Sequence, residues 1–293
     1  MNPVRLWVVA ARPRTLPAAV APVLVGTALA ISVDDFGGVA FLAALVGSVF
    51  LQIGTNLSND YSDARRGADT EDRLGPVRVT AGGLMPPKRV LAGTYVAFGV
   101  ACVAGVVLTV LAGPIMLVIG ALSIVAGVLY TGGPRPYGYS GLGEVFVFVF
   151  FGVVAVVFSF YAQTEKLPWE AFALSVPVGL LAAAILVVNN VRDIDTDRRA
   201  GKRTLAVKLG REPARRLFDA MLALSYLVCV AIPAAGGLSW WTLLVLLSIP
   251  LAVPLRATVA IHTDGPALNQ ALAATGRLLA VFSALLAAGV LLS

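Results

Sequence analysis

The sequence is poor in charged residues, cysteine and histidine. Asp, Glu, Lys and Arg make up 13 % of its 293 residues, against roughly 25 % in an ordinary soluble domain. Together with a mean hydropathy of +0.88, this composition excludes a soluble enzyme, a disordered chain and a secreted disulfide scaffold. Cys102 and Cys229 lie inside apolar runs, where a thiol acts as a small hydrophobic group, so neither a disulfide nor a thiolate metal site is expected.

The apolar residues fall into about nine stretches that are suited to crossing a membrane as helices. A span with its loop takes about 30 residues, so the chain length agrees with this number. The stretches are residues 15–32, 38–59, 90–112, 114–130, 142–161, 169–191, 217–235, 241–255 and 271–292. We therefore predict an all-α polytopic membrane protein in which residues 1–293 form a single integral-membrane domain.

The basic residues lie almost entirely in alternate loops. The loops after the first, third, fifth and seventh stretches together hold one basic residue, Lys166, whereas the N-terminal segment and residues 60–89 and 192–216 hold most of the others. Because Lys and Arg concentrate on the cytoplasmic side, we expect a multi-pass protein of the plasma (inner) membrane with a cytoplasmic N-terminus and an external C-terminus. Topology thereby accounts for the net charge of +6, and no nucleic-acid partner is expected.

Two apolar stretches end in matching clusters of polar residues. The first cluster is Gln52, Asn56, Asn59, Asp60 and Asp63, and the second is Asn189, Asn190, Asp193 and Asp197. Spacings of three and four residues place members of each cluster on one face of a helix. The two clusters have a similar order of Asn, Asp, Asp and Gly, about 133 residues apart, which indicates a weak internal repeat.

The placement of these carboxylates points to a cation and to an anionic substrate. Acidic groups at a helix C-terminus lie at the unfavourable end of the macrodipole and are costly near hydrocarbon unless paired. One such cluster would be explained as a solvated helix cap, but two matching clusters indicate a bound cation. Oxygen ligands without His or Cys suit Mg²⁺, and the neighbouring Arg and Lys would bind an anion that carries Mg²⁺. In a lipid-embedded bundle this implies a polyprenyl diphosphate.

An ion-coupled membrane transporter is the alternative from a different class, because it would also use intramembrane carboxylates and a repeat. Transporter carboxylates usually lie near the bilayer midplane. Here they lie at helix ends beside many basic residues, which favours an enzyme that opens to the cytoplasm.

Residues 59–63 and 193–197 resemble the two aspartate-rich motifs of the UbiA superfamily of intramembrane prenyltransferases. Four segments, in order, are similar to the 1,4-dihydroxy-2-naphthoate polyprenyltransferase branch: residues 12–17, residues 56–69 followed by 75–78, residues 135–144 and residues 189–207. The resemblance covers essentially the whole chain. It implies a bundle of about nine helices around a central cavity, with the motifs facing each other below a cytoplasmic cap made of loops 60–89 and 192–216.

The resemblance also implies an activity. Members of this branch transfer a polyprenyl group from polyprenyl diphosphate to 1,4-dihydroxy-2-naphthoate with loss of carbon dioxide, depend on Mg²⁺, and give demethylmenaquinol for menaquinone biosynthesis. Other members of the superfamily use a different aromatic acceptor, such as 4-hydroxybenzoate. Residues 75–78 and 135–144 favour the naphthoate branch.

Individual roles follow from the same resemblance. The expected Mg²⁺ ligands are Asp60, Asp63, Asp193 and Asp197. The expected catalytic set adds Asn56, Arg78, Asn189 and Lys202, with Arg78 and Lys202 holding the diphosphate. The expected substrate-binding residues are Arg14, Tyr130, Arg135, Tyr137 and Tyr139. Gly67 stands where the superfamily often has a third aspartate, so Asp69 and Asp72 are further candidates.

Overall fold

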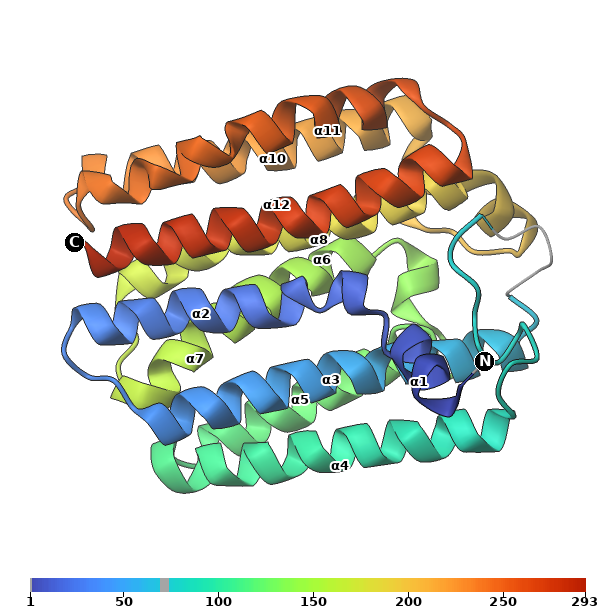
Figure 1. Cartoon of the computed structure of the whole chain (residues 1–293), viewed down its shortest axis with the longest axis horizontal. Coiled ribbons are helices and arrows are strands. Elements are labelled where there is room, and N and C mark those ends of the chain that lie inside the picture. The colour runs from blue at the N-terminus through green and yellow to red at the C-terminus, as the bar shows by residue number, and fades with distance from the viewer. Residues whose placement is uncertain (1, 69–73) are drawn as a thin grey trace.

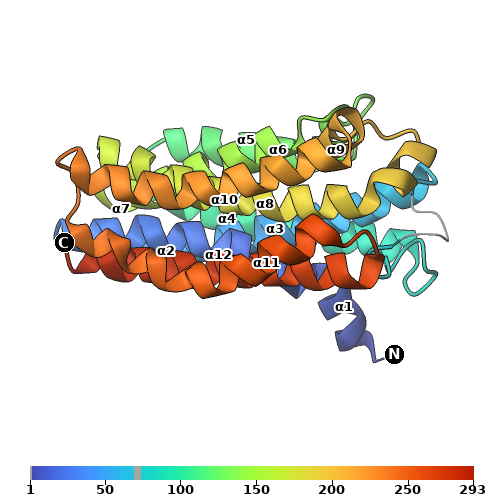
Figure 2. The ribbon, with the colours of Figure 1, turned by 90° about the horizontal axis from the view of Figure 1, so that it is seen from above.

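The computed structural model describes residues 2–68 and 74–293, and every regular element in these ranges is helical. The long helices run alongside one another in an elongated bundle (Figure 1 and Figure 2). In chain order the helices are α1 (Pro3–Ala11), α2 (Pro17–Ser32), α3 (Gly38–Arg65), α4 (Pro87–Ala112), α5 (Ile115–Leu129), α6 (Gly143–Val147), α7 (Ala155–Thr164), α8 (Trp169–Arg199), α9 (Leu205–Leu209), α10 (Arg211–Ala234), α11 (Ile249–Ile261) and α12 (Gly265–Leu291). Four other helical segments are η1 (Pro13–Thr15), η2 (Tyr137–Ser140), η3 (Phe148–Val154) and η4 (Trp240–Ser248).

The helices are long and apolar enough for a multi-pass membrane protein. In the described part of the chain, seven stretches meet this criterion by length and composition, and the pair Pro3–Thr15 and Pro17–Ser32 makes an eighth if the two count as one span. Helix α5 has 15 residues and is a shorter apolar helix. These elements correspond to the stretches expected from the sequence, so the prediction of an all-α polytopic membrane protein is confirmed.

The chain bends by 55° between α1 and α2. Arg12 ends α1 with φ of 54° and ψ of 71°, a left-handed conformation that residues other than glycine rarely adopt. Pro13 and Pro17 then begin new helical segments, in first-turn positions where the missing N–H is not needed. As a result α1 projects from the side of the bundle (Figure 2).

Helices α3 and α8 end in the same way. Gly67 and Gly201 follow them with φ of 63° and 73°. After Gly67, the amide of Ala68 donates to the carbonyl of Asp63 at 3.0 Å. After Gly201, the amide of Lys202 donates to the carbonyl of Asp197 at 2.9 Å. This is the Schellman arrangement of a helix C-terminus. The sequence repeat is therefore also a repeat of backbone geometry, and both helix ends lie at the end of the bundle opposite the C-terminus (Figure 1).

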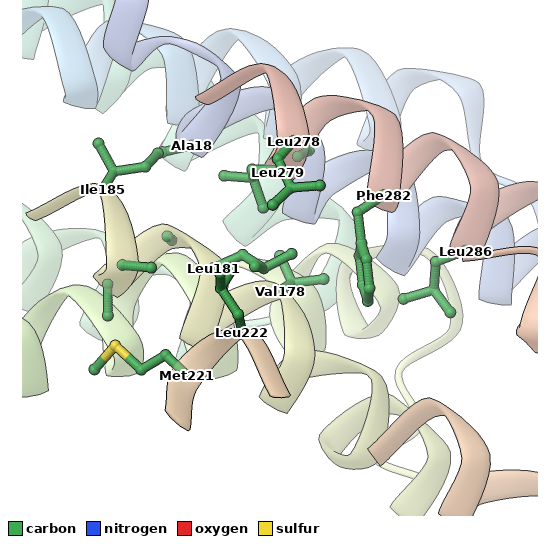
Figure 3. Packing of buried hydrophobic residues seen from close by; sticks show 14 of the residues in the cluster. Ala18, Val178, Leu181, Ile185, Met221, Leu222, Leu278, Leu279, Phe282 and Leu286 are labelled. Atoms are coloured by element: carbon green, nitrogen blue, oxygen red, sulfur yellow. The ribbon is translucent and has the colours of Figure 1, made fainter. Parts of the chain in front are cut away.

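The largest apolar core surrounds α8, whose apolar window is 72 % buried inside the protein. Figure 3 shows part of this packing, with side chains from α8, α10, α12 and α2 in contact around one another. The labelled residues are Val178, Leu181 and Ile185 of α8, Met221 and Leu222 of α10, Leu278, Leu279, Phe282 and Leu286 of α12, and Ala18 of α2. Close packing of this kind holds a helix rigidly, so the polar end of α8 has a fixed position.

Candidate functional site

A cavity of about 350 Å³ lies inside the bundle. Its walls come from α2, α3, α4, α5, α8 and the helical stretch from α6 to α7. Asp63 and Lys202 lie at the end where α3 and α8 finish, and Leu108, Met116 and Phe158 line the part toward the other end. A cavity that is charged at one end and apolar along its length suits an anion with a hydrocarbon tail.

Asp63 and Asp197 approach each other around Lys202. The Lys202 Nζ lies 3.9 Å from Asp63 Oδ2 and 4.0 Å from Asp197 Oδ1. All three residues are buried. Because Asp63 belongs to α3 and Asp197 to α8, the two acidic helix ends meet in space, as the sequence predicts.

Three side chains contact the carboxylate of Asp63. Its Oδ1 accepts the Tyr139 O–H at 2.6 Å, and its Oδ2 accepts an N–H of Arg78 at 3.2 Å, in addition to the contact with Lys202. The ring of Tyr139 lies 4.8 Å from the Lys202 Nζ, within the range of a cation–π contact. Two cations and a phenol therefore surround one carboxylate at the cavity end.

Asp60 holds the chain that leads from α3 to α4. Its Oδ2 accepts the backbone N–H of Val79 at 3.1 Å, and its Oδ1 accepts that of Thr80 at 3.0 Å. Asp60 is 2 % exposed, and an unpaired anion at such a position would be costly. The two bonds also place Arg78, the preceding residue, next to Asp63. Each carboxylate oxygen has two lone pairs, so both keep capacity for a further contact, although Asp60 is not among the residues that line the cavity.

Asp193 is bound by its neighbour in the sequence. Arg192 Nε donates to Asp193 Oδ1 at 2.8 Å, and Arg192 Nη2 donates to Asp193 Oδ2 at 2.6 Å. The same Nη2 donates to Asn189 Oδ1 at 2.8 Å. Asn189 and Asp193 both line the cavity, and the amide oxygen of Asn189 is directed to Arg192.

Two other amides at the cavity wall have different partners. Asn56 donates to the carbonyl of Ala11 at 3.0 Å and to the hydroxyl of Thr15 at 3.1 Å, so it stabilises the bend between α1 and α2. Asn190 donates to Glu144 Oε1 at 2.8 Å, and Glu144 is 4 % exposed. Asn56, which the sequence predicts in the catalytic set, lines the cavity and contacts the bend.

The three predicted tyrosines all line the cavity. Tyr137 contacts Tyr130 edge-on, with ring centroids 5.4 Å apart, and stacks on Phe146 at 4.0 Å. Its O–H donates to the carbonyl of Ala126 at 2.9 Å. Burial raises the pKa of Tyr137, so its phenol is neutral at pH 7. With Tyr139, these residues form an aromatic wall beside the acidic end.

The donor set fits a hard divalent cation that arrives with an anion. The described residues contain no group of three or more His, Cys, Asp or Glu that could hold a metal ion. They do provide carboxylates from two helices, which are all-oxygen donors of the kind that Mg²⁺ prefers. The ammonium group of Lys202 between Asp63 and Asp197 marks a position that favours positive charge. The predicted contributors Asp69 and Asp72 lie outside the described residues.

Comparison with known proteins identifies the family. Residues 19–282 match the model of the UbiA prenyltransferase family. The chain belongs to this family. It is 42 % identical over 289 residues to the 1,4-dihydroxy-2-naphthoate octaprenyltransferase of Mycobacterium tuberculosis, covering 97 % of this chain and 96 % of the relative. It is 39 % identical over 294 residues to the Escherichia coli K12 protein of the same name, covering 98 % and 95 %.

A solved structure has the same UbiA fold. The UbiA homologue from Archaeoglobus fulgidus bound to DMAPP and Mg²⁺ is similar with a TM-score of 0.61 and 17 % identity, over 97 % of this chain and 98 % of that one. The family predicted from the two aspartate motifs is thus confirmed by sequence and by fold.

In this UbiA family member, two predicted substrate residues lie away from the cavity. Arg14 and Arg135 are exposed and do not line it, whereas Arg12 does. For Arg14 the left-handed backbone of Arg12 explains the difference, because the chain changes direction there. Arg135 lies in the loop between α5 and η2. The Arg-Pro-Arg segment does not by itself show which arginine faces the cavity, so the sequence pattern does not single out Arg12.

Proposed function

We propose that this protein transfers a polyprenyl group from a polyprenyl diphosphate to 1,4-dihydroxy-2-naphthoate, releases carbon dioxide and makes demethylmenaquinol for menaquinone biosynthesis. The observation that carries the proposal is the meeting of two acidic helix ends around Lys202 at the end of a largely apolar cavity. The near full-length relatives named 1,4-dihydroxy-2-naphthoate octaprenyltransferase support the naphthoate as acceptor.

The proposed cofactor is Mg²⁺, held by Asp60, Asp63, Asp193 and Asp197. When bound, it neutralises negative charge on the diphosphate and so makes it a better leaving group. The oxygen-only donors support this choice, as does the related homologue bound to DMAPP and Mg²⁺.

Arg78 and Lys202 are the proposed diphosphate-binding residues. Both are 9 % exposed and both contact Asp63, so they are fixed in place before a substrate arrives. Charge-assisted hydrogen bonds from such groups to phosphate oxygens are strong. As the bond between the prenyl carbon and the diphosphate oxygen breaks, negative charge grows on that oxygen, and these fixed cations stabilise it.

The acceptor completes the reaction without an external oxidant. The ring carbon that carries the carboxylate forms a bond to the prenyl carbon, the carboxylate leaves as carbon dioxide, and the electron pair of the broken bond restores the aromatic ring. The π-faces of Tyr130, Tyr137 and Phe146 favour positive charge on the prenyl group, and the position of the cavity inside an apolar helix bundle limits the access of water to it. Arg12 and Tyr139 are the proposed polar contacts to the acceptor, because both line the cavity.

The proposed setting is the plasma (inner) membrane, with the N-terminus and the acidic end in the cytoplasm and the C-terminus outside. The N-terminus lies toward the acidic end of the bundle and the C-terminus at the other (Figure 1 and Figure 2). The excess of Lys and Arg in the loops at the acidic end supports this orientation. We further propose that residues 1–293 form one domain, in which loops 60–89 and 192–216 cap the cavity.

The test is prenyl transfer by the purified protein in detergent, with product mass as the readout. We offer prenyl diphosphates of several lengths with either 1,4-dihydroxy-2-naphthoate or 4-hydroxybenzoate, with and without Mg²⁺. We expect the decarboxylated naphthol product only with Mg²⁺, and none from folded Asp60→Ala or Asp193→Ala. Product from 4-hydroxybenzoate alone would refute the acceptor, and normal turnover by both variants would refute the metal ligands. Counterflow of a labelled solute in proteoliposomes without any product would favour a transporter.

A further inference from the structure

The guanidinium group of Arg192 is committed to protein partners. Of its five N–H donors, four are used: Nε and Nη2 bind the two oxygens of Asp193, Nη2 also binds Asn189, and Nη1 donates to Asn269 Oδ1 at 2.6 Å. The side chain is 0 % exposed. Arg192 does not line the cavity, whereas Asp193 does. The basic residue next to the second motif is therefore placed to act on Asp193 and not on a substrate anion.

Asn269 of α12 completes the hold on Arg192. Its Oδ1 accepts from Arg192, and its Nδ2 donates to the backbone carbonyl of Leu74 at 2.8 Å. Both ends of the amide are thus in use, so its orientation is fixed. Asn269 lies in neither aspartate motif and does not line the cavity, and nothing in the local sequence around it indicates a role.

We propose that Asn269 and Arg192 are positioning residues that fix the carboxylate of Asp193 for the cation. The inference rests on the proposed function, which makes Asp193 a Mg²⁺ ligand. Two parallel N–H bonds hold the carboxylate in one plane, and each oxygen keeps a lone pair for the cavity side. Asn269 binds Nη1, the guanidinium nitrogen that contacts neither Asp193 nor Asn189, and so restrains the rotation of the group. Without Asn269, Arg192 can turn about its long side chain and the plane of the carboxylate is no longer fixed.

Substitutions at Asn269 separate this role from a structural one. Asn269→Asp keeps an oxygen for Arg192 but loses the N–H that binds Leu74, whereas Asn269→Leu loses both contacts at similar size. Gln270→Leu is the matched control, because Gln270 is the next residue of α12 and is exposed. Arg192→Lys keeps the charge but replaces the planar group that binds both oxygens at once.

The measurement is Mn²⁺ binding to the purified full-length chain with inorganic diphosphate and no acceptor, followed by electron paramagnetic resonance. Groups that orient a metal ligand typically change metal affinity by about 10- to 100-fold, so we expect Asn269→Leu and Arg192→Lys to bind Mn²⁺ at least about 10-fold more weakly. We expect Asn269→Asp and Gln270→Leu to bind like the unsubstituted protein. Melting temperatures check that each variant is folded.

Three results would overturn the inference. The first is normal Mn²⁺ affinity in folded Asn269→Leu. The second is a loss in Asn269→Asp as large as in Asn269→Leu, because the contact with Leu74 would then be the one that matters. The third is normal affinity in Arg192→Lys, which also decides the matter if Asn269→Leu does not fold. If the unsubstituted protein binds no Mn²⁺, or if folded Asp193→Asn binds it as tightly as the unsubstituted protein does, the metal site of the proposed function fails as well, which distinguishes the two failures.

Discussion

Removing the hydroxyl group of Tyr139 measures how far the acidic centre depends on one hydrogen bond. The O–H donates to Asp63 at 2.6 Å, and Asp63 is 1 % exposed. A hydrogen bond to a charged group contributes about 1.5–3 kcal/mol, which corresponds to roughly 10- to 100-fold in a rate or binding constant. Tyr139→Phe keeps the ring beside Lys202, so the change is confined to the O–H. We expect kcat/KM for the prenyl diphosphate to fall by roughly this factor at saturating Mg²⁺.

The assay is the initial rate of product formation by mass spectrometry, with Tyr226→Phe as the control. Tyr226 of α10 shares a hydrogen bond of 2.8 Å with Ser248 and does not line the cavity. Its substitution removes the same chemical group, and we expect no change in kcat/KM. Equal kcat/KM for Tyr139→Phe and the unsubstituted protein, at unchanged melting temperature, would refute the role of Tyr139 in orienting Asp63.

Three further predictions concern the cavity, the core and a helix cap. Gly105 lines the cavity, and a Cβ added there meets no atom within 4 Å, so Gly105→Phe should fill part of the apolar section and shift the product masses toward shorter prenyl chains when a mixture is offered. Leu181 is 0 % exposed, so Leu181→Ala should cost about 2–5 kcal/mol and lower the melting temperature in detergent. Asp264 accepts the backbone N–H of Ala267, which lowers its pKa below the ordinary 3.8. Its stabilisation is therefore present above pH 3.8 and is lost as the pH falls through the lowered pKa, and Asp264→Asn should remove this part of the pH dependence of the melting temperature.

The spans and the two acidic helix ends were predictable because both depend on short-range patterns. Apolar stretches of spanning length mark membrane helices whatever their neighbours are. The spacing of Asp60 and Asp63 fixes a common helix face before any packing is known. The matching glycines at 67 and 201 also belong to this local pattern. In the structure both helices end in the same Schellman arrangement at these glycines.

The partners of the predicted residues were not predictable, since they come from distant parts of the chain. Asp60 binds the backbone amides of Val79 and Thr80. Because these donors belong to the backbone, the side chains at the two positions do not indicate the contact. Asn269 reaches Arg192 from α12. Whether Arg12 or Arg14 faces the cavity depends on the left-handed backbone of Arg12. Arginine rarely adopts this conformation, so the local sequence does not predict it.

The glycines that end α3 and α8 should make positions 67 and 201 intolerant of substitution, although both are exposed and uncrowded. A Cβ at Gly67 or Gly201 meets nothing within 4 Å, so crowding alone would permit alanine at both. A left-handed backbone, however, costs about 1–2 kcal/mol for most other residues. Relief of that cost would unwind the turn that carries Asp63 or Asp197. A saturation library selected for growth that depends on menaquinone synthesis by this protein should therefore retain glycine, or asparagine, at these two codons while neighbouring exposed codons vary freely.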